Sequence, residues 1–190
     1  MKLKLLILVL ALQSAWLLGP AAVQEHALAT GKVILLETAR VDPRDLLQGD
    51  YLILNYKISD VPTNLFSTAV KKDLPNDTKI FVALAPGTNQ FYVVTRASTN
   101  SLAPLSDTEV VLAGKSTYAW WNTTNSIHVE YGIERYYVAE GTGNPPVSRG
   151  SSGHGKLTAR AIVPASGHAK LQQVFLDGKP YEQAMKDAAP

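Results

Sequence analysis

Hydrophobic and polar positions follow two different patterns along the chain. Residues 5–24, between Lys4 and Glu25, are uncharged and dominated by Leu and Ala. As an α-helix rising about 1.5 Å per residue, this segment would span about 30 Å, the thickness of the hydrocarbon core of a bilayer. The pattern predicts one N-terminal transmembrane helix, with residues 1–24 as a membrane anchor and residues 25–190 as the body.

Two other interpretations of this segment remain open. A cleaved signal peptide has a basic start, an apolar middle and small residues at the cleavage point. Lys2 and Lys4 are a basic start, and the small residues lie at 20–22, beside a proline, or at 27–29, well past the apolar run. The third interpretation is a buried helix of a soluble protein. We favour the uncleaved anchor; an anchor and a signal would both export the body and leave the two lysines inside.

From Gly31 onwards, hydrophobic side chains recur with a period close to two, which is typical of β-strands. The expected strands are residues 32–38, 50–58, 79–85, 90–98, 109–114, 126–132, 133–141, 156–163 and 169–181. The short loop "PGTN" between the third and fourth of these predicts a β-hairpin.

The segment 50–58 differs from the others because it is hydrophobic on both faces. One face carries Tyr51, Ile53 and Asn55, and the other carries Leu52, Leu54, Tyr56 and Ile58. A strand of this kind usually lies between other strands or layers. We therefore expect Gly49-Asp50 to turn the chain so that residues 51–58 enter the middle of the sheet.

The remaining segments predict loops and short helices. Residues 141–156, rich in Gly, Ser and Pro, are expected to form a flexible loop. Residues 63–74 predict one or two helical turns capped by Thr63 or Asn64, and residues 182–190 a frayed end or a short helix. Together the patterns predict a mainly β protein: a single sandwich or partly closed barrel domain of about eight to ten strands.

Charge and composition exclude or disfavour some kinds of function for the body of the chain. The formal net charge is +2, and Lys2 and Lys4 account for it because residues 1–24 hold no acidic side chain. The body is therefore neutral and gives no indication of binding to nucleic acid. Because the chain has no cysteine, disulfides, a thiolate nucleophile and cysteine-ligated zinc are excluded.

Three blocks of the sequence carry a family resemblance. The first is "GDYLILNY", with Gly49, Asp50, Tyr51, Leu54 and Tyr56, preceded by Asp42, Pro43, Arg44 and Asp45. The second is "YGIERYYVAEG", with Glu134, Arg135, Tyr136, Tyr137, Glu140 and Gly141. The third is the last expected strand, "AKLQQVFLDGKPY". In this order, over roughly residues 28–181, the blocks resemble the GDYXXLXY family of exported bacterial proteins.

The resemblance implies a protein of the bacterial envelope. It would have a single anchor in the inner membrane, its N-terminus in the cytoplasm and its β domain in the periplasm or outside the cell. Relatives are often encoded beside, or fused to, multi-pass membrane proteins that also lack a known role. The family has no assigned activity, so the resemblance implies no catalytic residue and no cofactor. The chain departs from the family after Gly141, where relatives are usually charged and helix-prone.

The charged residues of the first two blocks form one candidate site. The acidic members are Asp42, Asp45, Asp50, Glu134 and Glu140. Crowded carboxylates have separated pKa values and can perform acid–base catalysis. We favour a structural interpretation, in which Asp42 starts a turn before Pro43, and Arg44 and Arg135 neutralise the acids at a strand entrance.

Other catalytic chemistry has little support. Pro43 and Gly49-Asp50 resemble a turn that leads into a strand in type I signal peptidases. Arg40, however, stands where those enzymes have their serine nucleophile. The histidines are scattered without the spacing of metal ligands: His26, His128, His154 and His168. His128 is expected to be a partly exposed strand residue. No metal, nucleotide or other cofactor is predicted.

Paired aromatic residues are candidates for a contact surface. Trp120-Trp121 and Tyr136-Tyr137 each place one ring on either face of a strand. One ring of each pair is expected in the core, and the other is available to a ligand or a protein, because Trp and Tyr offer large contact areas.

The favoured hypothesis is a non-enzymatic, membrane-anchored extracytoplasmic module. It would contact lipid through residues 5–23 and interact with a multi-pass inner-membrane protein. One alternative is an envelope hydrolase that uses the carboxylates of residues 42–50 with Glu134 or Glu140. Another is a small barrel that binds an apolar ligand.

Overall fold

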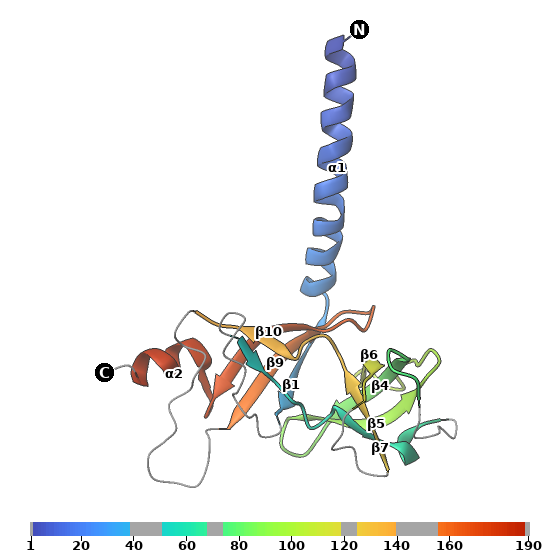
Figure 1. The fold of residues 1–190 in the computed structure, drawn as a ribbon, viewed down its shortest axis with the longest axis vertical. Helices are drawn as coiled ribbons and strands as arrows, with labels where there is room; N and C mark the ends of the chain where they lie inside the picture. Colours follow the sequence, from blue (N-terminus) through green and yellow to red (C-terminus); the bar gives the residue numbers. More distant parts are fainter. Residues whose placement is uncertain (1, 39–50, 68–73, 119–124, 140–155, 189–190) are drawn as a thin grey trace.

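The computed structural model describes residues 2–38, 51–67, 74–118, 125–139 and 156–188. These residues form one long N-terminal helix that stands away from a β-rich body (Figure 1). The predicted mainly β class after one N-terminal helix is confirmed. The described residues hold eleven strands, more than expected, because the predicted strand 169–181 is divided into two and a further short strand, at Asp60–Pro62, follows the predicted strand 50–58.

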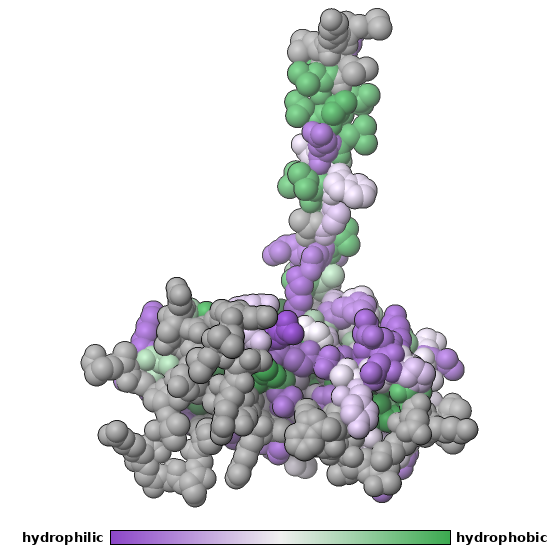
Figure 2. Space-filling view, viewed as in Figure 1, coloured by the Kyte–Doolittle hydropathy of each residue, from purple (hydrophilic) through white to green (hydrophobic). Residues whose placement is uncertain are grey.

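Helix α1 (Lys2–Ala29) leaves its apolar side chains uncovered. Its segment Leu6–Ala29 is long and apolar enough to cross a membrane, a property that signal sequences share. Trp16 is 80% exposed and Leu17 is 71% exposed. Figure 2 shows this apolar helix above a body whose coloured residues are mostly hydrophilic on the visible face. A buried helix of a soluble protein is therefore ruled out, since the described part of the body covers none of the apolar window.

Four strands form an antiparallel sheet with the order β1-β9-β10-β11. They are β1 (Lys32–Glu37), β9 (Leu157–Val163), β10 (Lys170–Leu176) and β11 (Lys179–Pro180). In β9, Leu157, Ala159 and Ala161 are buried and the residues between them are not, as the alternation predicted. The turn between β10 and β11 places Asp177 and Gly178 at φ values of 51° and 82°, a geometry that tight hairpins favour.

Five further strands form a second antiparallel sheet with the order β3-β7-β6-β4-β5, which curls into a nearly closed, barrel-like shape. They are β3 (Asp60–Pro62), β4 (Lys79–Pro86), β5 (Tyr92–Ser98), β6 (Val110–Ser116) and β7 (Ser126–Glu130). Strands β4 and β5 make the hairpin predicted from "PGTN". The Gly87 N–H closes it with a hydrogen bond of 2.8 Å to the Phe91 carbonyl oxygen.

The remaining strands, β2 (Tyr51–Ile53) and β8 (Arg135–Tyr137), pair only with each other as a two-stranded ribbon. The prediction of a long strand in the middle of a sheet is therefore wrong. The chain turns after Tyr56, where the Ser59 N–H donates to the Tyr56 carbonyl oxygen at 3.0 Å. Only one face of this segment is covered, because no described element packs over the other, and Ile53 remains 38% exposed.

One hydrophobic core joins the three sheets. Its largest fully buried side chains are Tyr56, Tyr181, Ile34, Leu36, Leu54, Ile80, Leu84 and Leu112. Tyr181 begins helix α2 (Tyr181–Ala188), which packs Ala184 and Met185 against the same core. The sequence left residues 182–190 as either a frayed end or a short helix, and the structure shows the helix.

The other short helix is one turn at the start of the segment that was expected to form one or two turns. The 3₁₀ helix η1 (Thr63–Leu65) is preceded by Pro62 as its N-cap and has no side-chain cap. The predicted cap by Thr63 or Asn64 is wrong, because Pro62, at φ −59° and ψ 135°, already leads the chain into the first turn. Residues 68–73, the Trp120-Trp121 pair and the predicted flexible loop up to residue 155 lie outside the described residues.

Candidate functional site

The β2–β8 ribbon brings two distant blocks of the sequence together. Tyr51 pairs with Tyr137, Leu52 with Tyr136, and Ile53 with Arg135. The Leu54 N–H continues the contact with a hydrogen bond of 2.7 Å to the Glu134 carbonyl oxygen. The remaining predicted site residues lie outside the described residues: Asp42, Pro43, Arg44, Asp45, Gly49, Asp50, Glu140 and Gly141.

The inner face of the segment that continues from β2 belongs to the core. Leu54 and Tyr56 are 0% and 1% exposed. The Tyr56 hydroxyl donates to the Ile133 carbonyl oxygen at 2.6 Å, and the Tyr131 hydroxyl donates to the Ile58 carbonyl oxygen at 2.8 Å. Burial, with a smaller effect of the Glu134 charge, raises the pKa of both phenols. These tyrosines therefore stay neutral and act as structural hydrogen-bond donors.

The outer face of the ribbon, which we call the ribbon face, consists of Tyr51, Ile53, Arg135 and Tyr137. The Arg135 guanidinium lies 5.7 Å from the centre of the Tyr51 ring. The Tyr51 and Tyr137 rings are 6.1 Å apart and tilted by 51°. Tyr137 is 72% exposed. The described contact of Arg135 is thus with an aromatic ring. Of the acids that the arginines were expected to neutralise, Glu134 is described and its carboxylate accepts the Tyr131 N–H, and the other four lie outside the described residues.

Tyr136, the other member of the tyrosine pair, points inward toward α2, as expected for a ring on the opposite face. Its ring meets Tyr181 edge-on at 6.3 Å. Its hydroxyl donates to the Glu182 carboxylate, which also accepts a 2.8 Å hydrogen bond from Gln173 Nε2. Burial and then the Glu182 carboxylate raise the pKa of the Tyr136 phenol. Tyr136 therefore ties the ribbon to β10 and α2.

Glu134 lies on the wall of a cavity at the end of strands β4, β6 and β7. Its carboxylate accepts a 2.5 Å hydrogen bond from the Tyr131 N–H. The cavity has a volume of about 530 Å³, and its charged or titratable lining residues are Lys79, Lys115, Glu130, Tyr131, Glu134 and His168. The hydrolase alternative is not tested, because its other carboxylates lie outside the described residues.

His128 is buried, not partly exposed as the sequence suggested. It is 7% exposed, and its Nδ1 lies 2.7 Å from Asp60 Oδ1 across the β3–β7 pair. The prediction failed because Ile127, His128 and Val129 are all buried, so both faces of β7 are covered and not only one. Within the described residues, no group of three or more His, Asp or Glu side chains is arranged to hold a metal ion.

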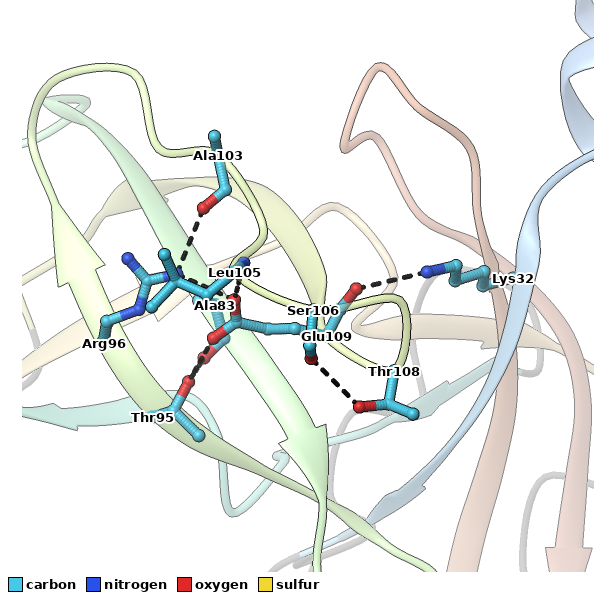
Figure 3. Close-up of polar contacts among 9 residues, drawn as sticks. All are labelled: Lys32, Ala83, Thr95, Arg96, Ala103, Leu105, Ser106, Thr108 and Glu109. Carbon is cyan, nitrogen blue, oxygen red and sulfur yellow. Dashed lines mark hydrogen bonds and ion pairs between the residues drawn. The ribbon is translucent and has the colours of Figure 1, made fainter.

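A buried carboxylate that the sequence analysis missed organises the loop between β5 and β6 (Figure 3). Glu109 is 6% exposed. It accepts hydrogen bonds from Thr95 Oγ1 at 2.9 Å, from Arg96 Nη2 at 2.7 Å and from the Leu105 N–H at 2.6 Å. Burial raises the pKa of this carboxyl, but the three hydrogen bonds outweigh burial and hold the pKa below its ordinary value. The available signal was Arg96, the one charged residue of strand β5.

Comparison with known proteins supports the resemblance seen in the three sequence blocks. The family described as GDYXXLXY protein matches residues 13–174. The match begins inside α1 and ends within β10, so it includes the ribbon and both larger sheets. No curated protein and no solved structure matches the chain.

Proposed function

We propose that this chain, which belongs to the GDYXXLXY family, is a membrane-anchored binding module outside the cytoplasm. Its partner would be a multi-pass membrane protein, which it would bind through the ribbon face. One observation carries the proposal. The two blocks that meet in the ribbon fill the core with one face and leave Tyr51, Arg135 and Tyr137 on the other.

The chemistry of the ribbon face supports a protein partner. Tyr and Arg are enriched among the residues that dominate binding energy at protein interfaces. Arg135 is already stacked on Tyr51, so little side-chain entropy would be lost when a partner covers the pair. The inward neighbours Leu52 and Tyr136 hold the ribbon on the core, which makes the surface rigid.

Helix α1 supports the choice of a partner within the membrane. Its exposed apolar surface favours a permanent place in a bilayer. A body tethered in this way meets other membrane proteins at a high effective concentration, so that a small contact surface suffices for binding. The charge balance of the body also favours a specific surface over general electrostatic attraction.

Photocrosslinking from the ribbon face tests the proposal. A benzoylphenylalanine at position 137 keeps the tyrosine ring and adds a benzoyl group that an exposed position can accommodate, and Tyr118 offers a matched control because it is 78% exposed while Tyr137 is 72% exposed. The full-length protein would be crosslinked in its native membrane and the adducts identified by mass spectrometry. We expect a multi-pass membrane protein to be captured from position 137 and not from position 118. Capture of the same proteins from both positions, or of soluble proteins alone, would contradict the proposal.

A further inference from the structure

We propose that the loop of residues 103–109, which we call the braced loop, rests on the surface of the bilayer that α1 crosses, with Leu105 among the lipid headgroups. The inference deepens the proposed function, since it rests on α1 being a membrane anchor. It adds a second point of contact with lipid, made by the body itself.

The braced loop has a defined shape although it joins two strands at the surface. Arg96 Nη2 donates to the Ala103 carbonyl oxygen at 3.1 Å, and the Leu105 N–H donates to the Glu109 carboxylate at 2.6 Å. The Glu109 N–H donates back to the Ser106 carbonyl oxygen at 3.1 Å. Burying a carboxylate is costly unless it is fully hydrogen-bonded. Here the buried Glu109 fixes the loop around Leu105, as Figure 3 shows.

The loop presents a large apolar side chain to the outside. Leu105 is 77% exposed even though its own N–H is held by Glu109. Single exposed leucines are common and carry little meaning on their own. The position of this one, described next, is what points to lipid.

The braced loop is attached to the end of α1 that adjoins the body, residues 29–32, which we call the foot of the helix. Lys32 Nζ donates to the Asp107 carbonyl oxygen and lies 3.4 Å from the Glu109 carbonyl oxygen. Lys32 is the first residue of β1, and α1 ends at Ala29. The connection is short and tightly packed, because a Cβ on Gly31 would lie 2.5 Å from Ile162 Cγ2. The loop therefore cannot be far from the membrane if α1 is within it.

The length of α1 places this foot at headgroup level. The exposed apolar side chains of the helix end at Val23, and the polar residues 24–26 follow. From Val23 to Ala29 the helix rises about 9 Å, close to the depth of one headgroup layer, which is about 5–8 Å. Transmembrane helices tilt by about 20° on average, which lowers one side of an attached body toward the bilayer. Leu105, which is 77% exposed, and Val33, which is 54% exposed, are apolar side chains that would gain from such a tilt.

The chain contains no cysteine, so a single introduced cysteine can carry a reporter. Leu105→Cys and Tyr118→Cys, in separate full-length proteins, would each be labelled with the fluorophore NBD. The two positions are matched in exposure, at 77% and 78%. They lie beyond opposite ends of β6, whose seven residues span about 20 Å. Each protein would be reconstituted into phosphatidylcholine–phosphatidylglycerol vesicles with and without lipid that carries a nitroxide quencher on its headgroup.

We expect NBD at position 105 to lose most of its fluorescence to the headgroup quencher, and NBD at position 118 to keep its fluorescence. Equal quenching at both positions, or none at 105, overturns the inference for a protein that resists carbonate extraction from the vesicles. If the protein is extracted by carbonate, α1 is not an anchor, and the proposed function fails together with this inference. Circular dichroism of each labelled protein checks that the fold is retained.

Discussion

The hydroxyl of Tyr56 donates a 2.6 Å hydrogen bond to the carbonyl oxygen of Ile133 inside the core. The bond joins the segment that follows β2 to the segment that precedes β8. A tyrosine of the family motif thus fixes β2 and β8 from the core side, and the ribbon face is the opposite, outer side of these two strands.

Replacing Tyr56 by phenylalanine should destabilise the body without unfolding it. The change keeps the buried ring but leaves the Ile133 carbonyl without this donor, which costs about 1–2 kcal/mol of the free energy of unfolding. Thermal unfolding of the full-length protein in detergent, followed by near-ultraviolet circular dichroism, measures the loss. Tyr118→Phe is the matched control, since its side chain is 78% exposed and should leave the melting temperature unchanged. An unchanged melting temperature for the Tyr56 variant would show that the bond contributes nothing.

The same substitution to aspartate should affect the stability of the fold very differently at Leu54 and at its neighbour Ile53. Leu54 is 0% exposed and Ile53 is 38% exposed on the opposite face. Leu54→Asp buries an unpaired carboxylate and removes core packing, so we expect at least about 4 kcal/mol of destabilisation and a failure to fold. Ile53→Asp should cost less than about 1 kcal/mol. Similar circular dichroism spectra and melting curves for the two variants would mean that the face assignment is wrong.

Glu109→Gln should destabilise the body near neutral pH by about 2–4 kcal/mol, because it leaves Arg96 beside a neutral amide in a buried network. The folded pKa of Glu109 lies below its ordinary value. Its stabilising effect is therefore complete above the unfolded pKa of about 4.3 and is lost as the pH falls through the folded pKa. Melting temperatures of both proteins between pH 7 and pH 3 should converge at the acidic end. A constant difference over this range would contradict the ionised state that we assign to Glu109.

Two glycines allow overpacking to be separated from backbone strain. A Cβ on Gly114 would lie 2.6 Å from Val129 Cγ1 and 2.7 Å from the Glu130 carbonyl oxygen. Gly132 has a φ of 79° and open space around its Cβ position. We expect Gly132→Ala to cost about 1–2 kcal/mol from strain alone, and Gly114→Ala to cost more, because strand β7 must move. The reverse order in chemical unfolding would show that β7 adapts to the added methyl group.

The ribbon face should govern partner binding and not stability. Arg135→Ala and Tyr137→Ala remove exposed side chains, so their melting temperatures should stay within a degree or two of the original protein, as surface changes usually do. If the residues dominate the interface, each change should weaken the affinity for the crosslinked partner about thirtyfold, equivalent to about 2 kcal/mol. Pull-down from detergent-solubilised membranes measures the loss, and Tyr118→Ala serves as the control. Undiminished recovery of the partner would place the interface elsewhere.

Local patterns predicted much of the architecture. Alternation identified β9, and the loop "PGTN" identified the β4–β5 hairpin, because these depend on residues that are near one another in sequence. Alternation failed for residues 51–58, where both faces are apolar and only the surrounding structure shows that one of them is left open. The burial of His128 and the hydrogen bonds of Glu109 were missed for the same reason, since their partners come from other strands or loops.

The sequence by itself determined the long apolar N-terminal helix, the mainly β class and the family, because hydrophobic length, strand periodicity and a motif of fixed spacing are properties of the chain alone. Only the tertiary structure decided that Tyr51 faces Tyr137 across a two-stranded ribbon, and that Lys32 holds the braced loop at the foot of α1. Contacts of this kind join residues 75 to 86 positions apart. Their existence depends on how the whole core packs, which no local pattern contains.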